Sequence, residues 1–205
     1  MAGLVSESER SLPATLASNA RALGGVTTVL WSVQLLNALL GHGLDQLGVV
    51  PRTGSGLVGI LAGPFLHASF AHLAMNTVAL WFLGGLTMTR RQLDFWVVGG
   101  IAAITAGLGT WLFGGAGTVH LGASGVIFGY LGFLLGRGVF ERTAFTLALA
   151  LGVLWFAGSM LLGMLPIGNP GVSWQAHLFG FAGGVLAART LAVARSGRAR
   201  IGLRR

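Results

Sequence analysis

Long apolar segments alternate with short polar connections along most of the chain. A helix needs about 20 apolar residues to cross the roughly 30 Å hydrocarbon layer of a bilayer. Six segments meet this requirement, at about residues 24–43, 65–88, 94–114, 122–140, 143–163 and 172–194. The pattern predicts an all-α membrane protein with a six-transmembrane-helix bundle over residues 24–194.

Three other segments fall outside this pattern. Residues 1–23 lack the apolar core and cleavage site of a secretory signal, and we expect a cytoplasmic tail of low order. Residues 44–63 are interrupted by Gly, Pro and charge, so we expect a long first outer loop or an interfacial element. Residues 195–205 are rich in arginine and are expected to form a basic cytoplasmic tail.

The composition supports the membrane assignment. Charged residues make up only 9% of the 205 residues and hydrophobic residues 54%, whereas soluble domains carry about 25% charged residues. The net charge of +8 comes from arginine alone, because the chain has no lysine. These arginines stand between apolar segments rather than clustering with aromatics on one face, so no nucleic-acid partner is expected. The chain has no cysteine, which excludes disulfides and thiol chemistry.

The placement of arginine predicts an orientation. Arginines stand before the first span (Arg10, Arg21), after the second (Arg90, Arg91), after the fourth (Arg137, Arg142) and after the sixth (Arg189 to Arg205). The opposite connections, 44–63, 114–122 and 164–172, contain only Arg52. Because basic residues concentrate on cytoplasmic loops, we expect a multi-pass protein of the cell (inner) membrane with both termini in the cytoplasm.

Four polar side chains within the spans are candidates for function, because such groups are costly in hydrocarbon. They are His72 and Asn76 in the second span, Ser124 in the fourth and His177 in the sixth. Asn76, Ser124 and His177 each lie 12 to 14 residues before an arginine at the cytoplasmic boundary, or about 18–21 Å of helix. Three spans therefore place a polar group near one plane, and His72 lies one turn further out on the same face as Asn76.

Other polar residues have plainer interpretations. A lone polar side chain in a membrane helix usually bonds a backbone carbonyl or a neighbouring helix, and we assign Gln34 and Asn37 to this class. His42 and His67 lie near the outer boundary and are expected to be interfacial. His120 is expected either to line a pocket or to be solvated.

The glycine-rich segment 114–123, GGAGTVHLGA, precedes Ser124. If Ser124 begins its helix below the outer surface, this segment must enter the membrane as irregular backbone. Such backbone is tolerated only where protein or water surrounds it. We therefore expect a wet cavity that opens outward and has Ser124 at its floor.

A serine and a histidine are sufficient for nucleophilic acyl transfer, in which the imidazole takes the hydroxyl proton and returns it to the leaving amine. None of the five acids lies on the outer half of the relevant spans, so a Ser124–His177 dyad is favoured over a triad. The N–H groups at the start of the Ser124 helix, with His72 and Asn76, are suitable donors to an oxyanion. A metal site is less favoured, because no acid or cysteine joins the histidines.

Glycines recur at helical spacing beside the serine and the histidine. They are Gly125, Gly129, Gly132 and Gly136 in the fourth span, and Gly180 and Gly184 in the sixth. Small residues at this spacing allow two membrane helices to approach closely. Such an approach is required for a hydrogen bond between Ser124 and His177, although rows of this kind also occur in generic helix packing.

Three motifs occur in order on the second, fourth and sixth spans: HLAMN (72–76), GASG (122–125) and AHLFGFAGG (176–184). In order, spacing and helix assignment they resemble the rhomboid family of intramembrane serine proteases. The resemblance covers about residues 24–194 and implies a rhomboid-like bundle. It also implies cleavage, without a cofactor or metal, of peptide bonds in or near transmembrane segments of single-span or polytopic membrane proteins.

The resemblance implies roles for individual residues. Ser124 would be the nucleophile, and His177 the general base and acid. His72, Asn76 and the Ser124 N–H would form the oxyanion hole.

The same motifs imply supporting residues, namely Gly122, Gly125, Phe128 and Gly180. Phe128 stands where the family often has a tyrosine, so stacking on the histidine is kept and a hydroxyl is lost. A Trp-Arg pair common in the family's first outer loop is missing from residues 44–63.

Two alternative functions stay open. A rhomboid-like protein that binds transmembrane segments without cutting them usually lacks the serine or the histidine, and this chain keeps both. A transporter or channel often carries an internal repeat, and the six segments show none. Labelling by a fluorophosphonate serine probe would separate these functions from proteolysis.

Overall fold

The computed structural model describes residues 11–167 and 171–202, and every regular element in this part of the chain is a helix. The first half holds α1 (Leu12–Leu39), η2 (Gly43–Leu47), α2 (Gly54–Ala62), η3 (Gly63–Phe65), α3 (Phe70–Ala79), η4 (Leu80–Gly84) and α4 (Gly85–Thr87). The second half holds α5 (Gln92–Phe113), α6 (Ser124–Glu141), α7 (Ala144–Ala157), η5 (Gly158–Met164) and α8 (Trp174–Gly202). Because α3, η4 and α4 join end to end and η5 continues α7, these elements form six long helices.

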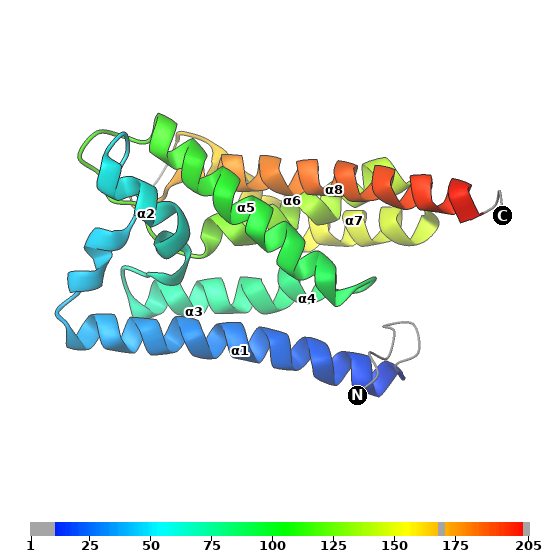
Figure 1. The fold of residues 1–205 in the computed structure, drawn as a ribbon, viewed down its shortest axis with the longest axis horizontal. Helices are drawn as coiled ribbons and strands as arrows, with labels where there is room; N and C mark the ends of the chain where they lie inside the picture. The colour runs from blue at the N-terminus through cyan, green and yellow to red at the C-terminus, as the bar shows by residue number, and fades with distance from the viewer. Residues whose placement is uncertain (1–10, 168–170, 203–205) are drawn as a thin grey trace.

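The six long helices run between the two ends of one bundle (Figure 1). One end, which we call the loop end, carries residues 40–69, 114–123, 165–167 and 171–173 and lies at the left of the figure. The opposite end, which we call the arginine end, carries residues 88–91 and 142–143, the start of α1 and the end of α8. The predicted all-α, six-helix fold class is confirmed.

Five of the described helices are long and apolar enough to cross a membrane. They are Leu12–Leu39, Phe70–Thr87, Gln92–Phe113, Ala144–Met164 and Trp174–Ser196. The sixth predicted span, α6, is different because most of its residues are buried between the other helices. A helix surrounded by protein does not have to be apolar on every side, so α6 can carry Arg137 and Glu141.

Two predicted boundaries differ from the structure. Helix α1 begins at Leu12 rather than near residue 24, because the Ala- and Leu-rich residues before 24 favour helix and Pro13 lies in the first turn. Helix α8 continues to Gly202, through most of the predicted tail. The segment 44–63, expected to be a long outer loop or an interfacial element, contains the short helices η2 and α2.

Glycines explain how α2 packs against the preceding chain. Thr53 caps α2, and its Oγ1 accepts a hydrogen bond from the Gly56 N–H at 3.0 Å. A Cβ atom at Gly56 would meet the backbone of Val50, and one at Gly59 would meet the backbone of Gly48. These backbone contacts leave no room for a larger side chain at either position. The glycines that interrupt the apolar pattern of residues 44–63 therefore permit a compact helical connection.

Helices α6 and α8 interlock through the predicted glycine rows. A Cβ at Gly180 would meet the carbonyl oxygen of Gly125, and a Cβ at Gly184 would meet that of Gly129. On α6, a Cβ at Gly132 would meet the carbonyl oxygen of Phe181. The two backbones are therefore in direct contact along several turns, as the spacing predicted.

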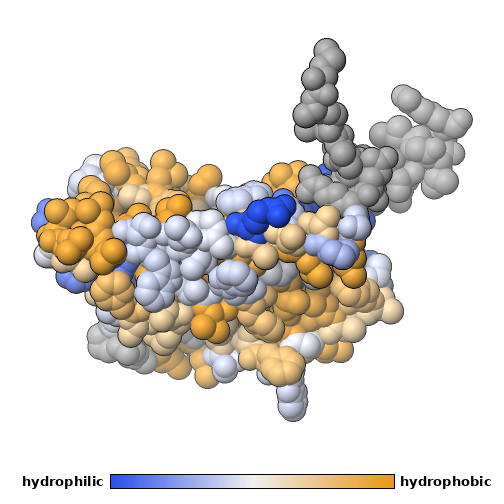
Figure 2. All heavy atoms as spheres, turned by 90° about the horizontal axis from the view of Figure 1, so that it is seen from below, coloured by the Kyte–Doolittle hydropathy of each residue, from blue (hydrophilic) through white to orange (hydrophobic). Residues whose placement is uncertain are grey.

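The surface of the bundle is apolar over large areas. Figure 2 shows one face that is mostly hydrophobic, with a paler polar band across it. Several large side chains are strongly exposed, among them Trp155 at 84%, Phe156 at 76% and Val78 at 72%. Apolar exposure on this scale is typical of a surface that meets lipid.

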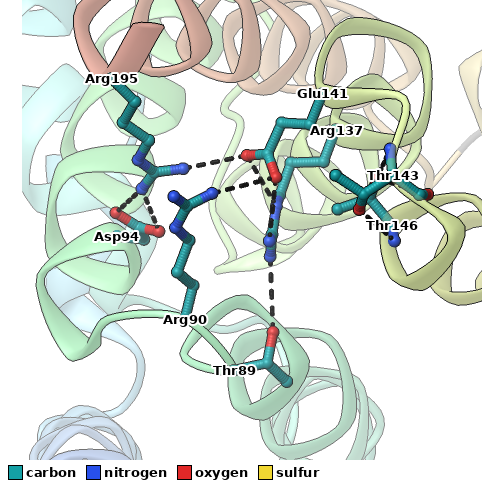
Figure 3. A network of polar contacts seen from close by, with 8 residues as sticks. All are labelled: Thr89, Arg90, Asp94, Arg137, Glu141, Thr143, Thr146 and Arg195. Atoms are coloured by element: carbon teal, nitrogen blue, oxygen red, sulfur yellow. Dashed lines mark hydrogen bonds and ion pairs between the residues drawn. The ribbon is translucent and has the colours of Figure 1, made fainter. Parts of the chain in front are cut away.

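Charged residues at the arginine end form one network, shown in Figure 3. Arg195 donates to both carboxylate oxygens of Asp94 at 2.6 Å and to Glu141 at 3.0 Å. Glu141 also binds Arg137 at 3.2 Å and Arg90 at 3.3 Å. We call these five residues the arginine–acid network, and it joins α5, α6, α8 and the connection that follows α4.

The sequence analysis interpreted the arginines as markers of the cytoplasmic membrane boundary, and the network shows that one of them is buried within the protein. Arg137 is only 2% exposed and is paired within the protein. Arg90 and Arg137 nevertheless contact the same Glu141, so two of the markers used to compare depths do lie at one level.

Candidate active site

Ser124 is the first residue of α6. The preceding segment is irregular, and His120 pairs with Val49 through two backbone hydrogen bonds of 2.8 and 2.9 Å. The Gly122 N–H donates to the Gly63 carbonyl at 2.9 Å, and Gly122 has a φ of 124°, a conformation that favours glycine. The irregular segment is thus held by residues of the 44–63 connection and its neighbours.

The structure brings Ser124 and His177 together. The Ser124 Oγ lies 2.9 Å from the His177 Nε2, within hydrogen-bond distance. The two residues come from α6 and α8, and a Cβ at Gly125 would lie 3.3 Å from the carbonyl oxygen of Ala176. The small-residue packing between these helices therefore permits the contact.

The second ring nitrogen of His177 fixes the direction of that hydrogen bond. His177 Nδ1 lies 2.9 Å from the Gly163 carbonyl oxygen, which can only accept. Nδ1 therefore carries the proton in the neutral ring, and Nε2 keeps a lone pair. Nε2 is consequently able to accept the Ser124 hydroxyl proton.

Phe128 stacks on His177 from one turn along α6. The two ring centroids are 4.1 Å apart and the planes are inclined by 8°. Phe128 is buried, at 4% exposed, so its ring limits how far the imidazole can rotate.

The side chains of His72 and Asn76 converge on the segment before Ser124. A Cβ at Gly122 would lie 3.1 Å from His72 Nε2 and 3.7 Å from Asn76 Nδ2. Asn76 Nδ2 is buried and has no hydrogen-bond partner among the described residues. An unpaired buried donor is costly, and Asn76 is among the residues that line the cavity beside Ser124.

His67 is a site residue that the sequence analysis assigned to the interface. It is fully buried, and its Nε2 accepts a hydrogen bond from the Ala123 N–H at 3.3 Å. Its ring meets that of His72 edge to face, with centroids 5.2 Å apart. Burial, followed by repulsion from His72, lowers the pKa of His67 from 6.5 to about 4. A neutral His67 thus supports both His72 and the residue before Ser124.

His120 is part of the pocket wall, which decides between its two interpretations. Its Nδ1 lies 2.8 Å from Ser173 Oγ and its Nε2 2.7 Å from Thr118 Oγ1. Burial lowers the pKa of His120 below its usual value. The ring thus links the segment before α6 to the turn before α8.

A cavity of about 870 Å³ opens above these groups. Its polar lining includes His72, Asn76, Ser124 and His177, the four residues that the depth comparison selected. Its apolar lining includes Met75 and Ala79 of α3, Ile127 and Phe128 of α6, and Met160 of η5, together with residues of the neighbouring connections.

The remaining candidates lie apart from this cavity. Asn37 binds Asp45 at 2.8 Å and the Leu44 N–H at 3.0 Å, which is a structural role. Gln34 is buried in α1, and His42 is exposed at the loop end. Within residues 11–167 and 171–196, no three His, Asp or Glu side chains are grouped so as to hold a metal ion.

Two residues of the candidate site were not predicted from the sequence. His67 precedes its helix, so hydropathy placed it at the surface, although its position five residues before His72 was a usable signal. Gly163 contributes a backbone carbonyl, and no side-chain pattern could have marked it.

Comparison with known proteins gives a consistent result. A family model described as Rhomboid domain matches residues 55–194, which include every residue of the cavity named above. Uncharacterized protein Rv1337 of Mycobacterium tuberculosis is 42% identical over 181 residues, covering 82% of this chain and 75% of that protein. Uncharacterized protein ML1171 of Mycobacterium leprae is 39% identical over 181 residues, covering 82% and 72%.

Proposed function

This chain belongs to the rhomboid family, and we propose that it is a serine endopeptidase that cuts peptide bonds in or near transmembrane segments of membrane proteins. The observation that carries the proposal is the 2.9 Å contact between Ser124 Oγ and His177 Nε2, beneath a cavity large enough for a peptide. The neutral tautomer that Gly163 favours leaves Nε2 ready to act as a base.

In the acylation step, Ser124 Oγ attacks the scissile carbonyl carbon while His177 Nε2 takes the hydroxyl proton. The carbonyl π bond opens and the negative charge moves to its oxygen. Asn76 Nδ2, His72 and the Ser124 N–H are the donors for that oxyanion, as their positions around Gly122 support. When the oxyanion collapses, the C–N bond breaks and the leaving nitrogen takes the proton from His177.

In the deacylation step, a water molecule attacks the Ser124 ester and gives a proton to His177. The second oxyanion collapses, the bond to Ser124 Oγ breaks, and His177 returns its proton to that oxygen. The products are a carboxylic acid and an amine, and the enzyme returns to its starting state. His177 thus acts in turn as a base and as an acid in each step.

The substrate class follows from where the site lies. Ser124 lines a cavity inside a multi-pass membrane bundle, and the cavity walls on α3 and η5 include the apolar side chains of Met75, Ala79 and Met160. A peptide bond inside a helix is shielded by its own turn, so the substrate has to unwind to reach Ser124. We propose membrane-protein segments that unwind easily as substrates.

The arginine distribution supports an orientation for this activity. The loop end carries Arg52, whereas most of the arginines in the described residues lie at the arginine end. By the positive-inside rule, both termini are cytoplasmic, and the cavity opens on the extracytoplasmic side of the inner membrane.

A fluorophosphonate serine probe and a single-span model substrate test the proposal in detergent. We expect the wild type to label and to cleave, and Ser124→Ala to do neither. His177→Ala should lose at least about a thousandfold in cleavage rate. The matched control is Ser32→Ala, which removes an exposed hydroxyl from α1 and should behave as wild type.

Two results would contradict the proposal. Labelling that persists in Ser124→Ala would exclude Ser124 as the nucleophile. A folded wild type that neither labels nor cleaves would instead support a rhomboid-like protein that binds transmembrane segments without cutting.

A further inference from the structure

Within the described part of the chain, the imidazole of His177 has no carboxylate partner. Among the described residues, Asp45 binds Asn37, while Asp94 and Glu141 belong to the arginine–acid network at the far end of the bundle. The group at His177 Nδ1 is the carbonyl oxygen of Gly163 at 2.9 Å. A backbone group thus occupies the place that an acid holds in a triad.

The carbonyl belongs to η5, the segment that continues α7. Met160 of the same segment lines the site cavity, and Met160, Leu161 and Met164 pack against the buried core. The hydrogen bond therefore joins α8, which carries the base, to a segment that forms one wall of the cavity.

A side chain at position 163 would crowd this contact. A Cβ there would lie 3.3 Å from His177 Nδ1 and 3.3 Å from Phe128 Cζ, which is tighter than an ordinary van der Waals contact. Phe128 restrains the face of the imidazole and Gly163 restrains its edge. Together they leave one orientation, with Nε2 directed at Ser124.

We propose that Gly163 is a positioning residue whose carbonyl oxygen holds His177 in the Nδ1–H tautomer, and that η5 is thereby part of the working site. This inference rests on the proposed function. It has two consequences: the substrate is accommodated without displacing Gly163, and a shift of η5 away from α8 releases the base even though Ser124 and His177 are intact.

The test compares Gly163→Ala with Gly158→Ala. Both lie in η5, and a Cβ at Gly158 would also meet a neighbour at 3.3 Å, but that neighbour is Leu154 Cδ1 rather than the dyad. We measure the rate of fluorophosphonate labelling, kcat and KM for the model substrate, and Tm. Gly163→Ala should lower the labelling rate and kcat by about tenfold to a hundredfold, with KM and Tm nearly unchanged. Gly158→Ala should stay within about twofold of wild type in labelling rate and kcat.

A second variant covers the case in which Gly163→Ala fails to fold. An ester in place of the amide between Gly163 and Met164 keeps the side chains and weakens the carbonyl as an acceptor. It should slow labelling severalfold, and equal labelling by the ester variant and the wild type would overturn the proposal.

Nitrogen-15 NMR of the labelled His177 ring gives a readout that does not depend on activity. The proposal requires Nδ1 to carry the proton in the wild type and a mixture of tautomers in Gly163→Ala. A wild-type ring protonated at Nε2 would overturn the positioning role even if the protein is an active protease. Conversely, the expected tautomer in a protein that never labels would leave the positioning role standing and reject the proposed function.

Discussion

Phe128 lies flat against His177, with ring centroids 4.1 Å apart and planes inclined by only 8°. Because the proposed mechanism requires the imidazole to present Nε2 to Ser124 in every turnover, we expect Phe128→Leu to lower kcat by about tenfold. The matched control is Phe133→Leu on the same helix, which loses similar volume from a fully buried position. Steady-state cleavage of the model substrate measures the effect, and equal losses in the two variants would assign Phe128 a packing role only.

The contact between α6 and α8 predicts the most damaging small substitution in the chain. A Cβ at Gly184 would meet the Gly129 carbonyl oxygen and lie 2.8 Å from the Phe133 nitrogen. Because the backbones of α6 and α8 would have to separate, Gly184→Ala should lower the free energy of unfolding by at least about 2 kcal/mol. Gly152→Ala on α7 is the control, since a Cβ there meets no atom within 4 Å. Thermal unfolding in detergent should show a large fall in Tm for the first variant and none for the second.

The arginine–acid network predicts unequal effects from its two kinds of ion pair. The Arg137 side chain is only 2% exposed, and Glu141→Gln removes its counter-charge. We expect this variant to lose about 3 kcal/mol in free energy of unfolding. Arg90→Gln removes a side chain that is 48% exposed, and the loss should stay below about 1 kcal/mol. Denaturant unfolding of both variants checks the difference, and similar losses would mean that burial does not govern this network.

His67 predicts a dependence of stability on pH. Burial, with repulsion from His72, lowers its pKa from 6.5 in the unfolded chain to about 4 in the folded one. The unfolded chain therefore binds a proton first as the pH falls from 6.5 towards 4. Stability is complete above pH 6.5, and its loss on acidification has a slope of at most about 1.4 kcal/mol per pH unit from this group.

The variant His67→Gln isolates that contribution, because glutamine can still accept from the Ala123 N–H but does not titrate. We expect Tm to decline less steeply between pH 6.5 and 4 in His67→Gln than in the wild type. Other histidines titrate in both proteins, so the difference between the two curves is the quantity of interest. Parallel curves would show that His67 stays neutral in both states or is protonated in both.

Much of the candidate site could be predicted from the sequence, because the position of a residue along a membrane-spanning helix determines its depth in the bilayer. Counting residues from the arginines placed Asn76, Ser124 and His177 at one level, and the structure lines one cavity with all three. Glycine spacing then indicated which helices approach closely, and the contact between Gly180 and Gly125 agrees with it.

Other features depend on information that hydropathy does not carry. Hydropathy marks the apolar part of a helix and not its ends, so the start of α1 at Leu12 was missed. Arg195 pairs with Asp94, which is far away in sequence, and charge alone predicted only a boundary. Gly163 acts through its backbone, which every residue possesses.

The close packing of α6 against α8, through Gly125, Gly129, Gly132, Gly180 and Gly184, has a practical consequence for protein engineering. Neither helix can accept larger side chains there without losing the alignment of hydroxyl and imidazole, so that half of the cavity is fixed by the architecture. Met75, Ala79 and Met160 reach the cavity from α3 and η5 and take no part in these glycine contacts. A mutant library designed to change substrate selectivity should therefore vary those three positions and keep every glycine between α6 and α8.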